Sequence, residues 1–149
     1  KTREYAQLFT SLFRIRKMHK TYIALTHGKV SSQTKTLKDD LIFFEKDRKI
    51  IQKALSHLRV LRSTSYCSLV ELNPITGRKH QLRKQLYNIG NPIIGDDKYF
   101  INRRADKIKI KSKNLMLHAY KIKFMINNVK YNFKAEYDSE FEGFIKKNF

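Results

Sequence analysis

The residue types best suited to chemistry are concentrated in segment 73–83, which reads Asn-Pro-Ile-Thr-Gly-Arg-Lys-His-Gln-Leu-Arg. Proline and glycine in its first half predict a tight turn, and Thr76 is a suitable cap for a helix over about residues 78–89. The first turn of that helix carries three basic residues, Arg78, Lys79 and His80. Free backbone N–H groups at a helix start attract anions, so this arrangement predicts a phosphate-binding site.

The most specific prediction for this helix concerns the burial and the partner of Arg83. The apolar stripe at helical spacing is Leu82, Leu86 and Ile89, and a second face carries His80, Arg83 and Tyr87. Because core positions flank Arg83, we expect its side chain to be partly buried, and a buried guanidinium needs a carboxylate or phosphate partner. An ordinary structural ion pair with Asp96 or Asp97 is the alternative.

The surrounding elements predict one α+β domain over residues 1–149, with a mainly antiparallel mixed sheet flanked by helices. Helical spacing predicts helices near residues 5–13, 78–89 and 139–149. Apolar and β-branched runs predict strands at 22–26, 41–44, 58–62, 66–72, 115–126 and 129–133. Residues 29–39 and 101–114 are expected to be loops, and Asn127-Asn128 a hairpin turn.

Charge indicates the class of partner. The chain has 32 Lys and Arg against 13 Asp and Glu, a formal net charge of +19. Self-repulsion on this scale destabilises a compact state, which favours a polyanionic partner: RNA first, an anionic membrane surface second. The basic run that we expect to contact the RNA backbone is Arg14, Arg16, Lys17 and Lys20. A generally lysine-rich composition, or a merely solvated face, is the alternative.

Several classes of protein are disfavoured. Cys67 is the single cysteine, so no internal disulfide is possible and an intracellular, cytoplasmic location is expected. No apolar run approaches the roughly 18 to 20 residues of a membrane span. The five histidines are scattered and Asp96-Asp97 is more typical of a turn, so no metal site is expected.

The run Thr76-Gly-Arg-Lys-His-Gln-Leu-Arg83, followed by Ile89-Gly-Asn-Pro-Ile-Ile-Gly-Asp96 and a tyrosine, resembles the RluA-type family of RNA pseudouridine synthases. Three further segments agree in order: Lys20-Thr-Tyr-Ile-Ala-Leu25 with Gly28, Tyr66-Cys-Ser-Leu-Val-Glu-Leu72, and Leu115-Met-Leu-His-Ala119. The resemblance implies the catalytic-domain fold of these isomerases, which modify uridines in large-subunit ribosomal RNA and in tRNA. It also implies no metal or cofactor, because the reaction detaches a uracil, turns it and rejoins it through C5.

The resemblance also implies roles for three residues. Tyr22 is similar to the tyrosine that stacks on the target uracil and is proposed to take part in proton removal. Arg83 is similar to the basic residue that pairs with the catalytic aspartate, and Leu82 to the apolar residue packed against the flipped base. An aromatic or apolar face suits a flipped uridine, and a neighbouring arginine keeps an aspartate ionised.

The family's catalytic aspartate lies in a His-Arg-Leu-Asp-x-x-Thr-Ser-Gly motif that residues 1–149 do not contain. We therefore expect a catalytic domain incomplete at its N-terminus, with the aspartate upstream, and a chain that is inactive alone and prone to self-association. A non-catalytic basic RNA-binding module derived from the same fold is the alternative. Gln85 and Asn91 depart from the family, whose members commonly carry histidine at these positions.

Overall fold

A computed structural model of the chain describes residues 2–14, 17–46, 48–99 and 110–149, without the side chains of Phe13, Arg14 and Glu45. Its strands are β1 (His19–His27), β2 (Thr36–Glu45), β3 (Arg48–Ser63), β4 (Cys67–Pro74), β5 (Leu117–Ile126) and β6 (Val129–Lys134). Its helices are α1 (Arg3–Arg14), α2 (Gln81–Asn88) and α3 (Ser139–Asn148). The strands form one six-stranded sheet in the order β2-β3-β4-β1-β5-β6, and every pairing is antiparallel. The predicted α+β class is confirmed.

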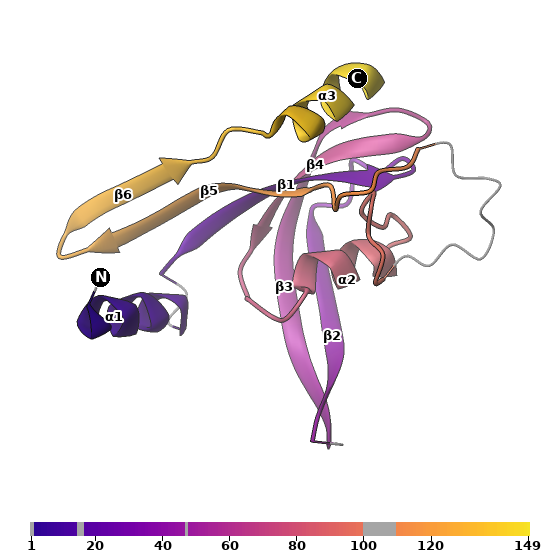
Figure 1. Cartoon of the computed structure of the whole chain (residues 1–149). Helices are drawn as coiled ribbons and strands as arrows, with labels where there is room; N and C mark the ends of the chain where they lie inside the picture. The colour runs from indigo at the N-terminus through magenta and orange to yellow at the C-terminus, as the bar shows by residue number, and fades with distance from the viewer. Residues whose placement is uncertain (1, 15–16, 47, 100–109) are drawn as a thin grey trace.

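Strand β1 lies in the middle of the sheet, between β4 and β5. Its run Ile23–Thr26 is buried on both faces, which explains why the sequence here is apolar without alternation. Residue alternation places Tyr22 on the face that α2 covers, while Ile23 lies opposite His118, whose ring contacts Phe141 of α3. The two helices therefore cover opposite faces of β1 (Figure 1).

Helix α2 packs through two leucines, Leu82 and Leu86, which are 6% and 0% exposed. Ile89, predicted as the third member of this stripe, is 38% exposed, so that part of the prediction is wrong. The helix ends at Asn88, and Ile89 is its C-cap residue, beyond the last position that faces the core.

The start of α2 also differs from the prediction. The helix begins at Gln81, and its N-cap residue is His80 in the left-handed conformation, with φ of 52° and no side-chain cap. Thr76 is not the cap: its hydroxyl donates to Oε1 of Gln81 over 2.7 Å and accepts the N–H of Leu55 over 2.9 Å. The Thr76 hydroxyl is thus shared between Leu55 of β3, which is distant in the sequence, and the side chain of Gln81.

Strands β2 and β3 form a long hairpin that projects past α2, the β2–β3 arm (Figure 1). Their pairing runs without interruption from Thr36 with His57 to Glu45 with Arg48. The predictions of a loop reaching residue 39 and a strand confined to 41–44 are therefore wrong, and residues 48–57 form a strand that was not predicted. Solvent reaches both faces near the tip, so neither strand needs a clear apolar alternation there.

The C-terminal elements follow the predictions. Asn127 and Asn128 both have positive φ, 49° and 61°, as a two-residue type I′ hairpin turn requires. Helix α3 is capped by Asp138, whose side chain accepts the N–H of Phe141 over 2.7 Å. The predicted loop 101–114 lies outside the described residues as far as 109 and is irregular from 110 to 114. Among the described residues, none of the three helices has the length and apolar character to cross a membrane.

Candidate active site

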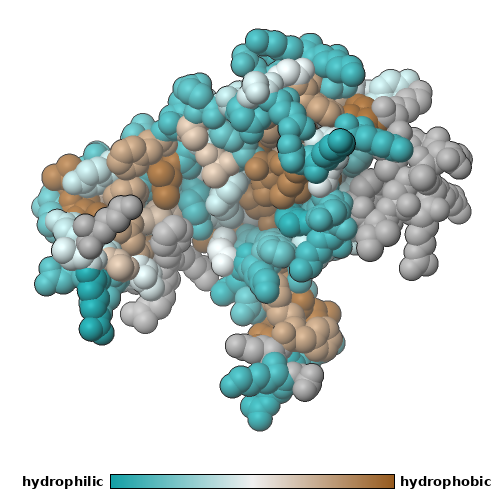
Figure 2. Space-filling view, in the orientation of Figure 1, coloured by the Kyte–Doolittle hydropathy of each residue, from teal (hydrophilic) through white to brown (hydrophobic). Residues whose placement is uncertain are grey.

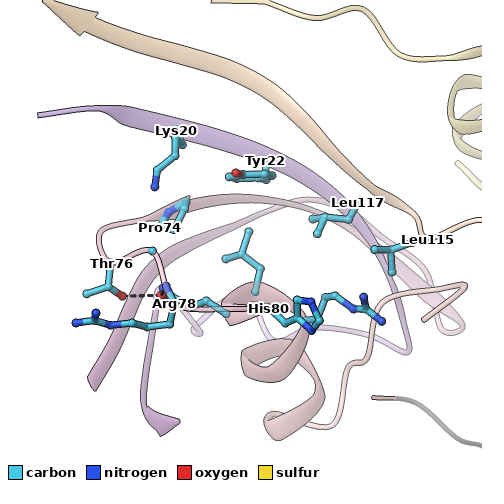
Figure 3. Close-up of a pocket in the computed structure, with 12 residues that line it drawn as sticks. Lys20, Tyr22, Pro74, Thr76, Arg78, His80, Leu115 and Leu117 are labelled. Carbon is cyan, nitrogen blue, oxygen red and sulfur yellow. Dashed lines mark hydrogen bonds between the residues drawn. The ribbon is translucent and has the colours of Figure 1, made fainter. Parts of the chain in front are cut away.

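A pocket of about 330 Å³ lies between β1 and the turn that leads into α2. Six of the ten predicted site residues line it: Lys20, Tyr22, Arg78, His80, Leu82 and Arg83. Figure 3 shows Lys20 and Tyr22 reaching from β1 toward this turn, with Leu115 and Leu117 closing one side. Three separate segments of the chain thus converge on one cavity.

The other four predicted residues either do not line this pocket or lie outside the part of the chain that the structure describes. Lys79 is exposed and does not line the pocket. Lys17 lines a different groove, between β1 and the β5–β6 hairpin. Arg16 and the side chain of Arg14 lie outside the described residues.

Tyr22 lies beside an irregularity in the sheet. Between Thr21 and Tyr22 the β1–β5 register shifts, so that Tyr22 pairs with Ala119 while Thr21 pairs with Lys121. The extra residue is Tyr120, so the bulge lies in β5, and bulges often occur beside active sites. Tyr22 is half-buried, and this burial raises its pKa. At neutral pH the group is therefore a neutral phenol.

Lys20 lies two residues before Tyr22 on the same face of β1 and reaches the turn before α2. Nζ of Lys20 lies close to this turn, since a Cβ added to Gly77 would be in van der Waals contact with it at 3.5 Å. Burial lowers the pKa of Lys20. The ammonium is thus less hydrated than a surface lysine, which strengthens its attraction to an anion in the pocket.

Arg83 makes a bidentate ion pair. Its Nε donates to Oδ2 of Asp96 over 2.8 Å and its Nη2 to Oδ1 over 2.6 Å, while exposed Asp97 accepts a longer bond of 3.3 Å from Nη2. The Arg83 side chain is 15% exposed and that of Asp96 1%, which confirms the predicted partial burial. The alternative prediction of an ion pair with Asp96 or Asp97 is also confirmed.

Asp96 is fixed from several directions. Its Oδ1 also accepts the backbone N–H groups of Lys98 and Tyr99, at 3.0 and 2.9 Å. Burial alone would raise the pKa of this carboxyl, but the hydrogen bonds from Arg83 and the two N–H groups lower it overall. The same pairing raises the pKa of Arg83, so both partners indicate a charged pair.

His80 has a partner that the sequence did not indicate. Its Nδ1 lies 2.7 Å from the hydroxyl of Tyr99, and the two rings meet edge to face. Desolvation lowers the pKa of His80, and the cationic side chains of Arg83, Lys98, Lys79 and Lys84 lower it further. His80 is therefore neutral at neutral pH and acts as a hydrogen-bonding ring.

The predicted phosphate site at the start of α2 differs from the observed geometry. The N–H of Arg78 donates to Oε1 of Gln81 over 3.0 Å, and the N–H of Gln81 donates to the carbonyl of Arg78 over 3.1 Å. These two donors are occupied, because the turn closes on itself before the helix begins. An anion at this turn therefore cannot use these two N–H groups.

A buried polar network supports the turn, and the sequence reading missed it. Gln81 connects Thr76 to Ser56, and the Ser56 hydroxyl donates to Oε1 of Gln85 over 2.6 Å. Nε2 of Gln85 donates to the carbonyl of Leu37, so the network reaches β2. The sequence feature that could have predicted this network is a pair of glutamines one turn apart beside Leu82 and Leu86, on the buried side of the helix.

Arg78 lies where the pocket meets a second groove of about 570 Å³ along the arm. Its Nε donates to the carbonyl of Lys53 over 3.2 Å, and none of the described carboxylates forms an ion pair with it. Arg78 is therefore not held in an ion pair by a described carboxylate, in contrast to Arg83. Nowhere in the described part of the chain do three or more His, Cys, Asp or Glu side chains gather as a metal site would need.

The family model described as RNA pseudouridylate synthase matches residues 1–88. Ribosomal large subunit pseudouridine synthase C of Rickettsia bellii (strain RML369-C) is 36% identical over 122 residues, which cover 74% of this chain and 38% of the relative. tRNA pseudouridine synthase C of Haemophilus ducreyi (strain 35000HP / ATCC 700724) is 32% identical over 141 residues, covering 81% of this chain and 58% of the relative. The chain thus spans less than two thirds of the length of these relatives.

A solved structure agrees on the fold. Human RNA pseudouridylate synthase domain containing 4 superposes with a TM-score of 0.80 at 24% identity, covering 98% of this chain and 68% of that one. Since the family model matches more than half of the chain and the fold is shared along nearly all of it, this chain belongs to the RNA pseudouridylate synthase family.

Proposed function

We propose that this chain forms the uridine-binding part of the catalytic domain of an RNA pseudouridine synthase. This enzyme is an isomerase that converts uridine to pseudouridine in ribosomal RNA or tRNA. The observation that carries the proposal is the convergence of Tyr22, Leu82 and Arg83 on one pocket. A concave site with apolar walls and a few convergent polar groups suits a flipped base. Relatives named for ribosomal RNA and for tRNA fit the chain about equally, so both substrates stay open.

In this proposal, Tyr22 and Leu82 provide the two apolar contacts of the base. The phenol ring stacks on the uracil, and Leu82, 6% exposed, packs against it. Because burial raises the pKa of Tyr22, direct proton abstraction by its phenolate is disfavoured at neutral pH. The neutral hydroxyl instead donates or accepts a hydrogen bond at the base.

The catalytic aspartate would come from a segment outside residues 1–149. We propose that Arg83 holds it in its ionised form through Nη1, the amino group that makes no hydrogen bond to any described residue. Arg78 is the second candidate for this role, because its guanidinium lines the same pocket and has no carboxylate partner among the described residues. Lys20 then contacts a phosphate of the substrate.

The proposed setting is the cytoplasm, where a single, fully buried and unpaired cysteine is usual. The test compares two proteins, the 149-residue chain and the same chain extended upstream through the aspartate motif. Each is incubated with unmodified ribosomal RNA and with tRNA, and pseudouridine is measured. We expect conversion by the longer protein only. Conversion by the short chain would refute this account of the site, and RNA binding without conversion by both would favour the non-catalytic module.

A further inference from the structure

His80 and Tyr99 form a hydrogen-bonded pair at the edge of the pocket. Nδ1 of His80 lies 2.7 Å from the Tyr99 hydroxyl, and the two ring centroids are 5.6 Å apart. His80 lines the pocket and Tyr99 does not, and Figure 3 shows the His80 ring on the α2 side of the pocket, across from Tyr22 on β1. No described residue forms a hydrogen bond with Nε2 of His80. The bond to Tyr99 therefore occupies one edge of the imidazole and leaves Nε2 for a ligand.

Tyr99 is held in place from two directions. Its backbone N–H donates to Oδ1 of Asp96 over 2.9 Å, and the guanidinium of Arg83 lies 5.1 Å from its ring centroid. The largely buried ion pair of Arg83 with Asp96 thus fixes the residue that contacts His80. The backbone of His80 has a φ of 52°, which residues other than glycine adopt rarely and often at functional sites. Both partners of the hydrogen bond therefore have defined positions.

The hydrogen bond determines which nitrogen of His80 carries the proton. A phenol is a stronger donor than a neutral imidazole, and the imidazole nitrogen is the more basic acceptor. Among the described residues the Tyr99 hydroxyl has no other acceptor. Burial raises the pKa of Tyr99, so the hydroxyl keeps its proton at neutral pH. Tyr99 therefore donates to Nδ1, and the proton of the neutral His80 ring lies on Nε2.

A fixed N–H donor distinguishes the two pyrimidine bases of RNA. Uracil has a carbonyl oxygen at C4, which accepts a hydrogen bond, whereas cytosine has an amino group there, which donates. Nε2–H can donate to the uracil oxygen, but against the cytosine amino group two donors would face each other. An imidazole that was free to change tautomer could accept from cytosine through Nε2. The hydrogen bond from Tyr99 prevents this change.

We infer that His80 selects uracil over cytosine by donating a hydrogen bond from Nε2 to the oxygen at C4, and that Tyr99 is the positioning residue that holds this tautomer. The inference rests on the proposed function for the presence of a base in the pocket, and adds the two residues that recognise its polar edge. Tyr22 and Leu82 contact the faces of a base, which uracil and cytosine share, so neither supplies this discrimination.

The first test determines the tautomer of His80 in the 149-residue chain by nitrogen NMR, at a pH well above the pKa of the imidazole. In the wild type we expect the proton on Nε2. Tyr99→Phe removes the hydroxyl and should give a mixture of the two tautomers. Tyr87→Phe is the control, because Tyr87 is an exposed tyrosine of α2 that does not line the pocket. A proton on Nδ1 in the wild type would overturn the inference.

The second test titrates the same chain with uridine 5′-monophosphate and cytidine 5′-monophosphate, which have the same ribose and phosphate. One hydrogen bond set against a contact of two donors predicts a preference of roughly tenfold for the uridine nucleotide in the wild type and in Tyr87→Phe. Tyr99→Phe should lose most of this preference by binding the cytidine nucleotide more tightly, because the freed imidazole can adopt the accepting tautomer. Equal weakening of both nucleotides would show a structural role for Tyr99 and overturn the inference.

His80→Asn is a second variant, because asparagine tolerates a positive φ and its amide can both donate and accept. It should bind the two nucleotides with nearly equal affinity. Equal affinities in the wild type, or a preference that survives both Tyr99→Phe and His80→Asn, would overturn the inference. Failure of the upstream-extended protein to form pseudouridine, with the preference for the uridine nucleotide intact, would overturn the proposed function alone.

Discussion

Arg83 donates two parallel hydrogen bonds to Asp96, from Nε over 2.8 Å and from Nη2 over 2.6 Å. This edge of the guanidinium fastens α2 to the loop that follows it. The remaining amino group, Nη1, has no hydrogen-bond partner among the described residues. One arginine thus has a structural edge and an edge available to a second carboxylate, so the two predicted roles of Arg83 do not exclude each other.

Replacing Asp96 by asparagine should strongly destabilise the fold. Breaking a buried ion pair from one side typically costs about 3 to 5 kcal/mol, because the remaining charge stays buried without a partner. The free energy of unfolding would be measured by urea denaturation. Asp97→Asn is the control: Asp97 is 95% exposed, and a surface change usually costs less than about 0.5 kcal/mol. Equal effects of the two changes would contradict the structural importance of the pair.

The same pair predicts how stability depends on pH. The pKa of Asp96 is lowered in the folded state, so the unfolded state binds more protons as the pH falls. The stabilising contribution is complete above the unfolded pKa of about 3.9 and is lost as the pH falls through the folded pKa. Denaturation curves at a series of acidic pH values should show this loss in the wild type and a weaker loss in Asp96→Asn.

In a protein extended through the aspartate motif, Tyr22→Phe should preserve RNA affinity and greatly reduce conversion of uridine. The ring that stacks on the base remains, and only the hydroxyl is removed. Conversion is measured under single-turnover conditions at saturating RNA, which separates the chemical step from binding. Full activity would reduce Tyr22 to a packing residue. A wild-type rate that rises tenfold per pH unit toward pH 10 would instead indicate a phenolate base.

The roles of the two arginines can be separated in the same extended protein. Arg83→Met should abolish conversion and lower stability, because it removes the partner of Asp96 as well as Nη1. Arg78→Ala should lower stability little, since Arg78 makes one hydrogen bond to a carbonyl, and should weaken RNA binding. If Arg78→Ala abolishes conversion while Arg83→Met retains it, the assignment of the two arginines must be reversed.

His80 should titrate below the usual histidine pKa of about 6.5. Desolvation and then the charges of Arg83, Lys98, Lys79 and Lys84 lower the pKa of this imidazole. An NMR titration of its ring protons gives the midpoint. Lys79→Gln and Lys84→Gln should each move the midpoint upward, because each removes a repelling cation. A midpoint above 6.5 in the wild type would show that His80 carries a charge available to phosphate.

The chemistry-bearing segment was predictable because its constraints are local. Gly77 and Pro74 require a turn, and Leu82 and Leu86 require a buried helix face, so the position of Arg83 follows, whereas Arg78 lies in the turn before the helix and not in its predicted first turn. The bidentate partner of Arg83 was one of two expected alternatives. The start of α2 was not predictable, because Thr76 bonds to Leu55, 21 residues earlier in the chain.

The β2–β3 arm shows where local patterns fail. Lys49, Gln52 and Lys53 interrupt any apolar alternation, yet residues 48–57 pair continuously with β2. Backbone pairing between β2 and β3 holds these residues in a strand, where side-chain burial does not. His80 with Tyr99 was similarly beyond prediction, since 19 residues separate the two rings and neither belongs to a periodic pattern.

The final prediction concerns the tip of the arm, where three apolar side chains are exposed on one face. Ile42 is 44% exposed, Phe44 76% and Ile51 58%, and Ile42 pairs directly with Ile51. Figure 2 shows apolar surface on this projection. Strand β2 is also an edge of the sheet, and an apolar edge strand favours association with other chains.

The net charge of +19 opposes association through repulsion that salt screens. We therefore expect the purified chain to self-associate more as salt is raised from about 0.05 to 0.5 M, where the Debye length falls well below 10 Å. Sedimentation velocity at several concentrations measures the association. Phe44→Lys should shift the equilibrium toward monomer, whereas Ile89→Lys, which adds the same charge at an isolated exposed position at the end of α2, should not. Equal dissociation by both variants would assign the effect to net charge, and association unchanged by Phe44→Lys would show that another surface is responsible.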